Sequence, residues 1–169
     1  MSGIRICCAV DSYSEDTLKR SIPSLEMARR MTSDELIHLV HIRYPLLRNP
    51  DELEQVGDVD WMGSRERLIM LKQYFNESEK EKERHTHGRI AEFCKNAFGE
   101  AFSPVIDIVS SPGQHADRII NHAEDISADM IFIASESLKG FSRIMLGSTA
   151  EQVVRKSKIP VAVFPRVSD

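Results

Sequence analysis

The stretch from Ile131 to Pro165, IFIASESLKGFSRIMLGSTAEQVVRKSKIPVAVFP, decides the fold of this chain. It holds a short apolar run, a polar loop, the triplet Gly147-Ser148-Thr149, a helical pattern and a second apolar run. A buried parallel strand over 129–134 that opens into a loop and then a helix brings small residues and backbone N–H groups toward an anion. The pattern favours a phosphate-binding site and predicts binding rather than bond cleavage.

The rest of the chain repeats this alternation of apolar runs and helical patterns. Strands are expected at 4–10, 35–42, 104–109, 129–134 and 160–164. Helices are expected up to Arg30 and over 64–98, 114–126 and 149–157. Because a mid-helix proline is costly, Pro23 predicts a kink in the first helix or a later start.

This order predicts an α/β fold, a three-layer sandwich in which a five-stranded parallel sheet carries helices on both faces. In such sheets ligands bind beyond the carboxyl ends of the strands, where the strand order reverses. Asp11 ends the first strand, and the loop from Ala134 to Leu146 follows the fourth. Both are expected to line a ligand crevice.

Size and composition limit the classes of function. The 169 residues fit a single domain over 1–169, with an irregular surface loop at 43–63. The 22 basic and 26 acidic residues give a net charge of −4, which offers no electrostatic footprint for nucleic acid. No apolar run approaches the ~18 residues of a membrane span, and Asp11 interrupts the first apolar run before a signal peptide could develop. We expect a cytoplasmic protein that binds neither nucleic acid nor membranes.

The cysteines and histidines predict no metal site. Cys7, Cys8 and Cys94 are odd in number, and the adjacent pair lies in an apolar run, which is typical of core thiols in a reducing compartment. His85 and His87 are two apart on an expected helix and do not share a face. The other histidines have no acidic or cysteine partner at ligand spacing.

Familiar catalytic motifs are missing from the sequence. It has no P-loop, no Rossmann fingerprint after the first strand and no Gly-x-Ser-x-Gly elbow. Neither Cys7 nor Cys8 has an activating base nearby in sequence. We therefore predict no catalytic residue.

The segment from 134 to 148 resembles the signature of the universal stress protein family: Gly, two residues, Gly, nine residues, then Gly followed by Ser or Thr. Here the same spacing holds Ala134, Ser137 and Gly147-Ser148, so two of the three glycines are replaced. The resemblance covers nearly the whole chain, with further matches at 9–11, 39–42, 113, 128–131, 141–148 and 159–163.

The resemblance implies an adenine nucleotide alpha-hydrolase-like fold that binds ATP or a related adenine nucleotide, with Mg²⁺. Asp11 would accept hydrogen bonds from adenine or ribose, Ile42 would pack on the base, and the Ser148 and Thr149 hydroxyls would donate to phosphate. Asp11 has a structural alternative as a strand-end or cap residue, and Ser148 and Thr149 as helix caps. The positions that match the family's nucleotide-binding residues are Ala9, Val10, Asp11, Ile42, Ile133, Ala134, Ser137, Gly147, Ser148 and Thr149.

The departures from the signature bear on phosphate affinity. Ala134 and Ser137 add side-chain atoms where the family has glycine, and Glu136 adds a negative charge to the same loop. The resemblance implies an ATP-binding stress-response sensor or regulator, whereas the lost glycines favour a nucleotide-free dimeric scaffold or interaction protein. Slow ATP hydrolysis or autophosphorylation occurs in the family, but no general base is identifiable here. A third alternative is another member of the adenine nucleotide alpha-hydrolase group, such as a sulfurylase or ligase domain.

The last apolar run predicts self-association. Residues 160–165, PVAVFP, form a short apolar edge bracketed by prolines, and an exposed apolar edge pairs readily with another chain. Dimers of the family pair antiparallel through this strand, so we expect a homodimer through Pro160 to Phe164. The alternative is that the prolines protect the edge.

Overall fold

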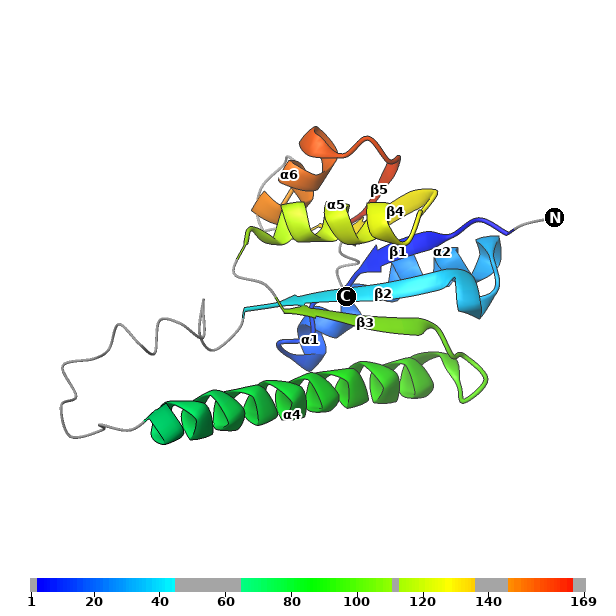
Figure 1. Cartoon of the computed structure of the whole chain (residues 1–169). Coiled ribbons are helices and arrows are strands. Elements are labelled where there is room, and N and C mark those ends of the chain that lie inside the picture. Colours follow the sequence, from blue (N-terminus) through cyan, green and yellow to red (C-terminus); the bar gives the residue numbers. More distant parts are fainter. Residues whose placement is uncertain (1–2, 45–64, 111–112, 136–145, 166–169) are drawn as a thin grey trace.

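Five parallel strands form the sheet of the computed structural model, which describes residues 3–44, 65–110, 113–135 and 146–165, without the side chains of 65–72 and 74–75. Their order across the sheet is β3-β2-β1-β4-β5 (Figure 1). Every pair of neighbours runs parallel. The strands are β1 (Ile6–Ala9), β2 (Ile37–Arg43), β3 (Val105–Ser110), β4 (Met130–Ala134) and β5 (Val161–Phe164).

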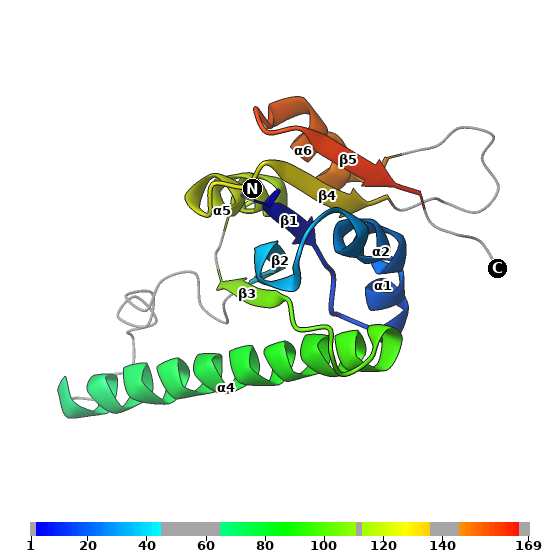
Figure 2. The same ribbon diagram turned by 90° about the vertical axis from the view of Figure 1, so that its right-hand side faces the viewer.

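Helices cover both faces of this sheet, which confirms the predicted three-layer α/β sandwich. The helices α5 (His115–Asp125) and α6 (Ser148–Lys156) lie on one face. The opposite face carries α1 (Glu15–Lys19), α2 (Ile22–Met31) and α4 (Arg65–Phe98), as Figures 1 and 2 show. A short 3₁₀ turn, η1 (Asp34–Leu36), leads into β2.

The central strand β1 divides the core into two clusters. Cys7 and Cys8 point to opposite faces, as strand geometry requires. Cys8 packs with Leu25 of α2 and Cys94 of α4, whereas Cys7 packs with residues of α5 and α6 such as Val153. All three thiols are free and buried, and burial raises the pKa of Cys7 to about 12 and that of Cys94 to about 11. They are core residues, as predicted.

The predicted elements are present, with shifted boundaries. The first helix is two helices, because Pro23 lacks an N–H and occupies the second position of a new helix, α2. Arg43 belongs to β2 rather than to the loop predicted at 43–63; residues 45–63 of that loop lie outside the described residues. The last strand begins at Val161 rather than Pro160, although the Pro160 carbonyl accepts a hydrogen bond from the Ile131 N–H at 2.9 Å.

Among the side chains of α4 that the structure describes, the buried ones lie in its C-terminal part. Its middle, over 76–89, is largely exposed, as its charged sequence predicts, whereas Ile90 and Cys94 are buried. An ion pair between Arg43 at the end of β2 and Glu79 adds a link near the middle of the helix. Within the described part of the chain, no helix is both long and apolar enough to cross a bilayer.

Two adjacent valines of α6 provide a test of this packing. Val153 is fully buried in the cluster with Cys7, whereas Val154 is 43% exposed. Val153→Ala is expected to lower the free energy of unfolding by about 2 kcal/mol, because it removes buried methyl groups and leaves a cavity. Urea denaturation measures the loss.

The matched control is Val154→Ala, which makes the same chemical change one residue further along the same helix. Helix propensity rises equally in both variants, so the difference between them reports burial alone. Equal effects of the two substitutions would contradict the placement of α6 on the sheet.

Candidate functional site

A cleft opens where the strand order reverses. From β1 the chain builds toward β2 and β3 on one side of the sheet, whereas β4 and β5 lie on the other side. The carboxyl ends of β1 and β4 therefore lie side by side with their outgoing loops diverging, which is where ligands bind in open α/β sheets. A cleft of about 210 Å³ lies there, bounded by the ends of β1, β2 and β4 and by the start of α6.

The structure brings nine of the ten predicted nucleotide-binding residues together in this cleft. Ser137 lies outside the described residues, as does Glu136. Ala134 is described and lines the cleft at the end of β4. The predicted residues that line the cleft are Ala9, Val10, Asp11, Ile42, Ile133, Ala134, Gly147, Ser148 and Thr149.

The N-terminus of α6 faces the cleft without a side-chain cap. Gly147 is the N-cap residue and supplies no side-chain hydrogen bond, while Ser148 and Thr149 are the first two helical residues. The alternative that their hydroxyls cap the helix is therefore wrong. The first intrahelical bond runs from the Glu151 N–H to the Gly147 carbonyl at 2.9 Å, so the amides of 148–150 precede it. Such a helix end attracts anions.

Asp11 is exposed at the end of β1 and forms a local turn. One carboxylate oxygen accepts a hydrogen bond from the Tyr13 N–H at 3.0 Å. The cap of α1 is Ser14, whose hydroxyl accepts from the Thr17 N–H in a reciprocal capping box. Asp11, two residues beyond β1, is thus not the helix cap, and its carboxylate borders the cleft.

Two histidines that the sequence did not indicate as site residues, His41 and His115, line the cleft. His41 is 3% exposed, and its Nδ1 atom lies 3.1 Å from the Val10 carbonyl. Burial has the largest effect and lowers the pKa of His41, although the hydrogen bond to the Val10 carbonyl and the Asp11 carboxylate oppose it. The positive charge on a protonated His115 and on Arg89 adds to the lowering. The neutral form of His41 is favoured, so the imidazole adds a polar edge rather than a charge.

Aromatic and cationic side chains complete the rim. Tyr13 is 61% exposed and lies edge-on to His41, with ring centroids 5.6 Å apart. Burial and the nearby Asp11 carboxylate raise the pKa of Tyr13, which keeps its hydroxyl protonated. Arg20, which follows α1, lines the same cleft. Its contribution was not visible in the sequence because it lies nine residues from Asp11 and is brought back by a short helix.

A buried hydroxyl in the cleft has no partner among the described residues. Ser135 is 1% exposed, its Oγ atom makes no hydrogen bond, and its backbone N–H donates to the Phe164 carbonyl at 2.8 Å. His115 also lines the cleft, and its buried Nε2 atom likewise has no hydrogen-bond partner among the described residues. Since buried polar atoms are nearly always satisfied, these two atoms indicate a place for a polar ligand.

Comparison with known proteins gives a family and short stretches of closer similarity. The model of the Universal stress protein family matches residues 5–165. The stress response protein NhaX of Bacillus subtilis (strain 168) is 41% identical over 58 residues, 34% of each chain. Universal stress protein MJ0531 of Methanocaldococcus jannaschii is 37% identical over 54 residues, 32% of each chain. These alignments thus span only about a third of the curated relatives.

Solved structures share the fold at low sequence identity. The protein MJ0577 has a TM-score of 0.60 at 20% identity, with 100% of both chains covered. A universal stress protein from Archaeoglobus fulgidus in complex with dAMP has a TM-score of 0.52 at 16% identity, covering 96% of this chain and 98% of that one. A universal stress protein in complex with cAMP has a TM-score of 0.51 at 15% identity, covering 97% and 98%.

The unpartnered hydroxyl gives a stability prediction. Ser135→Ala is expected to leave the free energy of unfolding unchanged or raise it by up to about 1 kcal/mol, because it removes a buried polar group that makes no hydrogen bond to any described residue. Urea denaturation of the ligand-free protein measures this.

Ser157→Ala is the control, since the Ser157 hydroxyl donates to the Ile159 carbonyl at 2.8 Å and accepts from its N–H at 3.0 Å. Losing these bonds is expected to cost about 1 kcal/mol. A comparable loss in Ser135→Ala would show that the Ser135 hydroxyl is already satisfied.

Proposed function

Because this chain belongs to the universal stress protein family, we propose that its cleft binds an adenine nucleotide, ATP with Mg²⁺ or a related form, and that binding makes it a stress-response sensor or regulator. The observation that carries the proposal is the convergence of the family's nucleotide positions on one cleft beside the uncapped start of α6. The related structures in complex with dAMP and cAMP support an adenine nucleotide as the ligand class.

The cleft offers a separate environment to each part of a nucleotide. Ile42 and Val40 provide apolar contact for the base, with the Tyr13 ring at the rim. The Asp11 carboxylate would accept hydrogen bonds from ribose hydroxyls or the adenine amino group. The amides of 148–150 and the Ser135 hydroxyl would donate to phosphate oxygens.

The proposed role is binding rather than catalysis. Nothing in the described cleft pairs a nucleophile with a base: His41 bonds to the backbone of Val10, and its pKa is lowered by burial. Conformational response to the bound nucleotide would then carry the signal.

The alternative function, a nucleotide-free dimeric scaffold, has support from β5. This strand is the last in the sheet order, and its four residues are half-buried. The Pro160 carbonyl accepts a backbone hydrogen bond from Ile131 of β4, and the Phe164 carbonyl accepts one from Ser135, directly after β4. In a parallel ladder the backbone groups of Val161 and Val163 therefore face the outer edge of the sheet. Within the described part of the chain no strand lies beyond that edge, so it can pair with a second copy, and pairing is compatible with either function.

Nucleotide binding is tested by calorimetric titration and thermal shift with ATP plus Mg²⁺, AMP and cyclic AMP, with GTP for comparison. A nucleotide at ~100 times its Kd should stabilise the fold by about 2.7 kcal/mol and raise Tm by roughly 5–10 °C. Asp11→Asn is expected to raise Kd by about 10-fold to 100-fold, because it weakens hydrogen bonds to a charged acceptor.

The control is Asp16→Asn, which removes another exposed carboxylate five positions away that does not line the cleft. It should leave Kd unchanged. If the wild-type protein shows no binding of adenine nucleotides at millimolar concentration, nucleotide binding is excluded and the scaffold function stands.

Dimerisation is tested by light scattering at micromolar concentration, where we expect twice the mass of one chain. Val163→Pro replaces a half-buried side chain and removes an outward N–H, but it leaves the N–H groups directed at β4 in place. It should give a folded monomer, because edge positions tolerate proline. Ala162→Pro removes an N–H directed at β4 and should instead destabilise the fold. A monomeric wild-type protein would contradict pairing through β5.

A further inference from the structure

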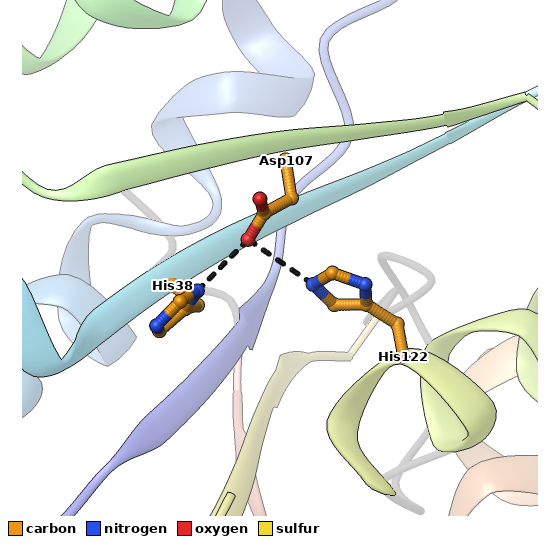
Figure 3. A group of neighbouring side chains, drawn as sticks. All are labelled: His38, Asp107 and His122. Atoms are coloured by element: carbon orange, nitrogen blue, oxygen red, sulfur yellow. Dashed lines mark hydrogen bonds and ion pairs between the residues drawn. The ribbon is translucent and has the colours of Figure 1, made fainter. Parts of the chain in front are cut away.

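We propose that His38, Asp107 and His122 form a binding site for one divalent transition-metal ion such as Zn²⁺. His38 lies on β2, Asp107 on β3 and His122 on α5, and their side chains converge (Figure 3). The Nδ1 atom of His38 lies 2.9 Å from Oδ2 of Asp107, and the Nε2 atom of His122 lies 3.1 Å from the same oxygen.

The fold brings together side chains that are far apart in sequence. The register pairs Val40 with Asp107, and since strand side chains alternate, His38 lies on the same face as Val40 and Asp107. This face is covered by α5, whose Ile119 and Ala123 are buried against it. His122 is next to Ala123 on this helix, and its side chain reaches Asp107 from the helix layer above the sheet. The sequence offered no acidic partner for it because the partner belongs to another element.

The donor set and its spacing suit zinc. Two imidazole nitrogens and one carboxylate form three protein ligands that leave a fourth position open. At Zn–N and Zn–O bond lengths near 2.0–2.2 Å, ligand atoms around a tetrahedral ion lie about 3.4 Å apart. The three ligand atoms here lie within 4.8 Å of one another, so an ion requires only small shifts of the three side chains.

Burial and access also fit an ion. The side chains of His38, Asp107 and His122 are 15%, 26% and 16% exposed. A carboxylate at this depth needs compensation, which the two imidazoles provide in the free protein and a cation would provide more strongly. The remaining exposure gives a hydrated ion a route to the ligands.

This site is separate from the nucleotide cleft. None of the three residues lines the cleft. His38 is the second residue of β2, whereas Ile42, at the cleft, is four residues further along, a distance of roughly 13 Å along a strand. Metal binding here therefore needs no nucleotide, and the proposal does not depend on the proposed function.

The test titrates the metal-free chain with ZnCl₂ alone by calorimetry, without nucleotide. We expect saturable binding of one ion per chain and a rise in Tm of roughly 5–10 °C at ~100 times Kd. Asp107→Asn and His122→Gln should each weaken binding by at least about 10-fold. The control His87→Gln removes an exposed histidine of α4 and should change nothing.

A measurement on the wild-type chain guards against variants that fail to fold. Histidine ¹⁵N NMR should show zinc-dependent shifts at Nδ1 of His38 and Nε2 of His122, and Co²⁺ should give a four-coordinate spectrum without a thiolate band. Three results would overturn the site: no saturable binding of Zn²⁺, shifts confined to other histidines, or a thiolate-to-cobalt band that indicates a cysteine such as the neighbouring Cys7.

Discussion

The hydrogen bonds that join β1 to β2 on one side and to β4 on the other determine the arrangement of every other element. β1 is only four residues long. Its side chains are buried on both faces, as Cys7 and Cys8 show, and its backbone pairs with β2 along one edge and with β4 along the other. The chain leaves β1 toward β2 and leaves β4 toward β5, in opposite directions across the sheet. The loops after β1 and β4 therefore diverge. A strand that stabilises the core by being fully enclosed thus also creates an opening at its carboxyl end.

The residues that form the cleft at that opening include polar groups whose hydrogen bonds are not satisfied within the described part of the chain, which lowers the stability of the protein locally. The start of α6 lacks a side-chain cap, and the Ser135 hydroxyl lies buried without a partner among the described residues. A buried hydroxyl without a hydrogen bond typically costs about 1 kcal/mol or more, whereas glycine at the cap position costs only a few tenths of a kcal/mol. The same helix is held firmly from its other side, where Ala150 and Val153 are buried in the cluster with Cys7. Firm packing on one side lets the helix keep unsatisfied groups on the other, and those groups are the ones that an anionic ligand needs.

The sequence predicted the layers of the fold because short apolar runs and helical periods are local signals. It also indicated where the cleft lies, because Asp11 was identified from the end of the first apolar run and Gly147 from the spacing of the family signature. It placed Ser135 in a loop expected to line the cleft, but it did not predict His41 as a cleft residue. Nor did it predict the meeting of His38, Asp107 and His122, because such contacts depend on strand register and on how α5 lies across the sheet. The capping role weighed for Ser148 and Thr149 was wrong for a similar reason: the helix begins one residue earlier than the sequence pattern suggested, so Gly147 takes the cap position. Register and helix phase are set by the whole core and leave no signature at single residues.

The helix α5 connects the two ends of the sheet. His115 at its start lines the cleft, and His122, two turns later, meets Asp107. Between them Ile119 and Ile120 are buried, which holds the helix as one rigid element. Strand β2 makes a second connection, through His38 at one end and Ile42 at the other. A nucleotide in the cleft and an ion at the three ligands would therefore act on the same two elements, and thermodynamic linkage requires that any change one makes in the affinity of the other be reciprocal.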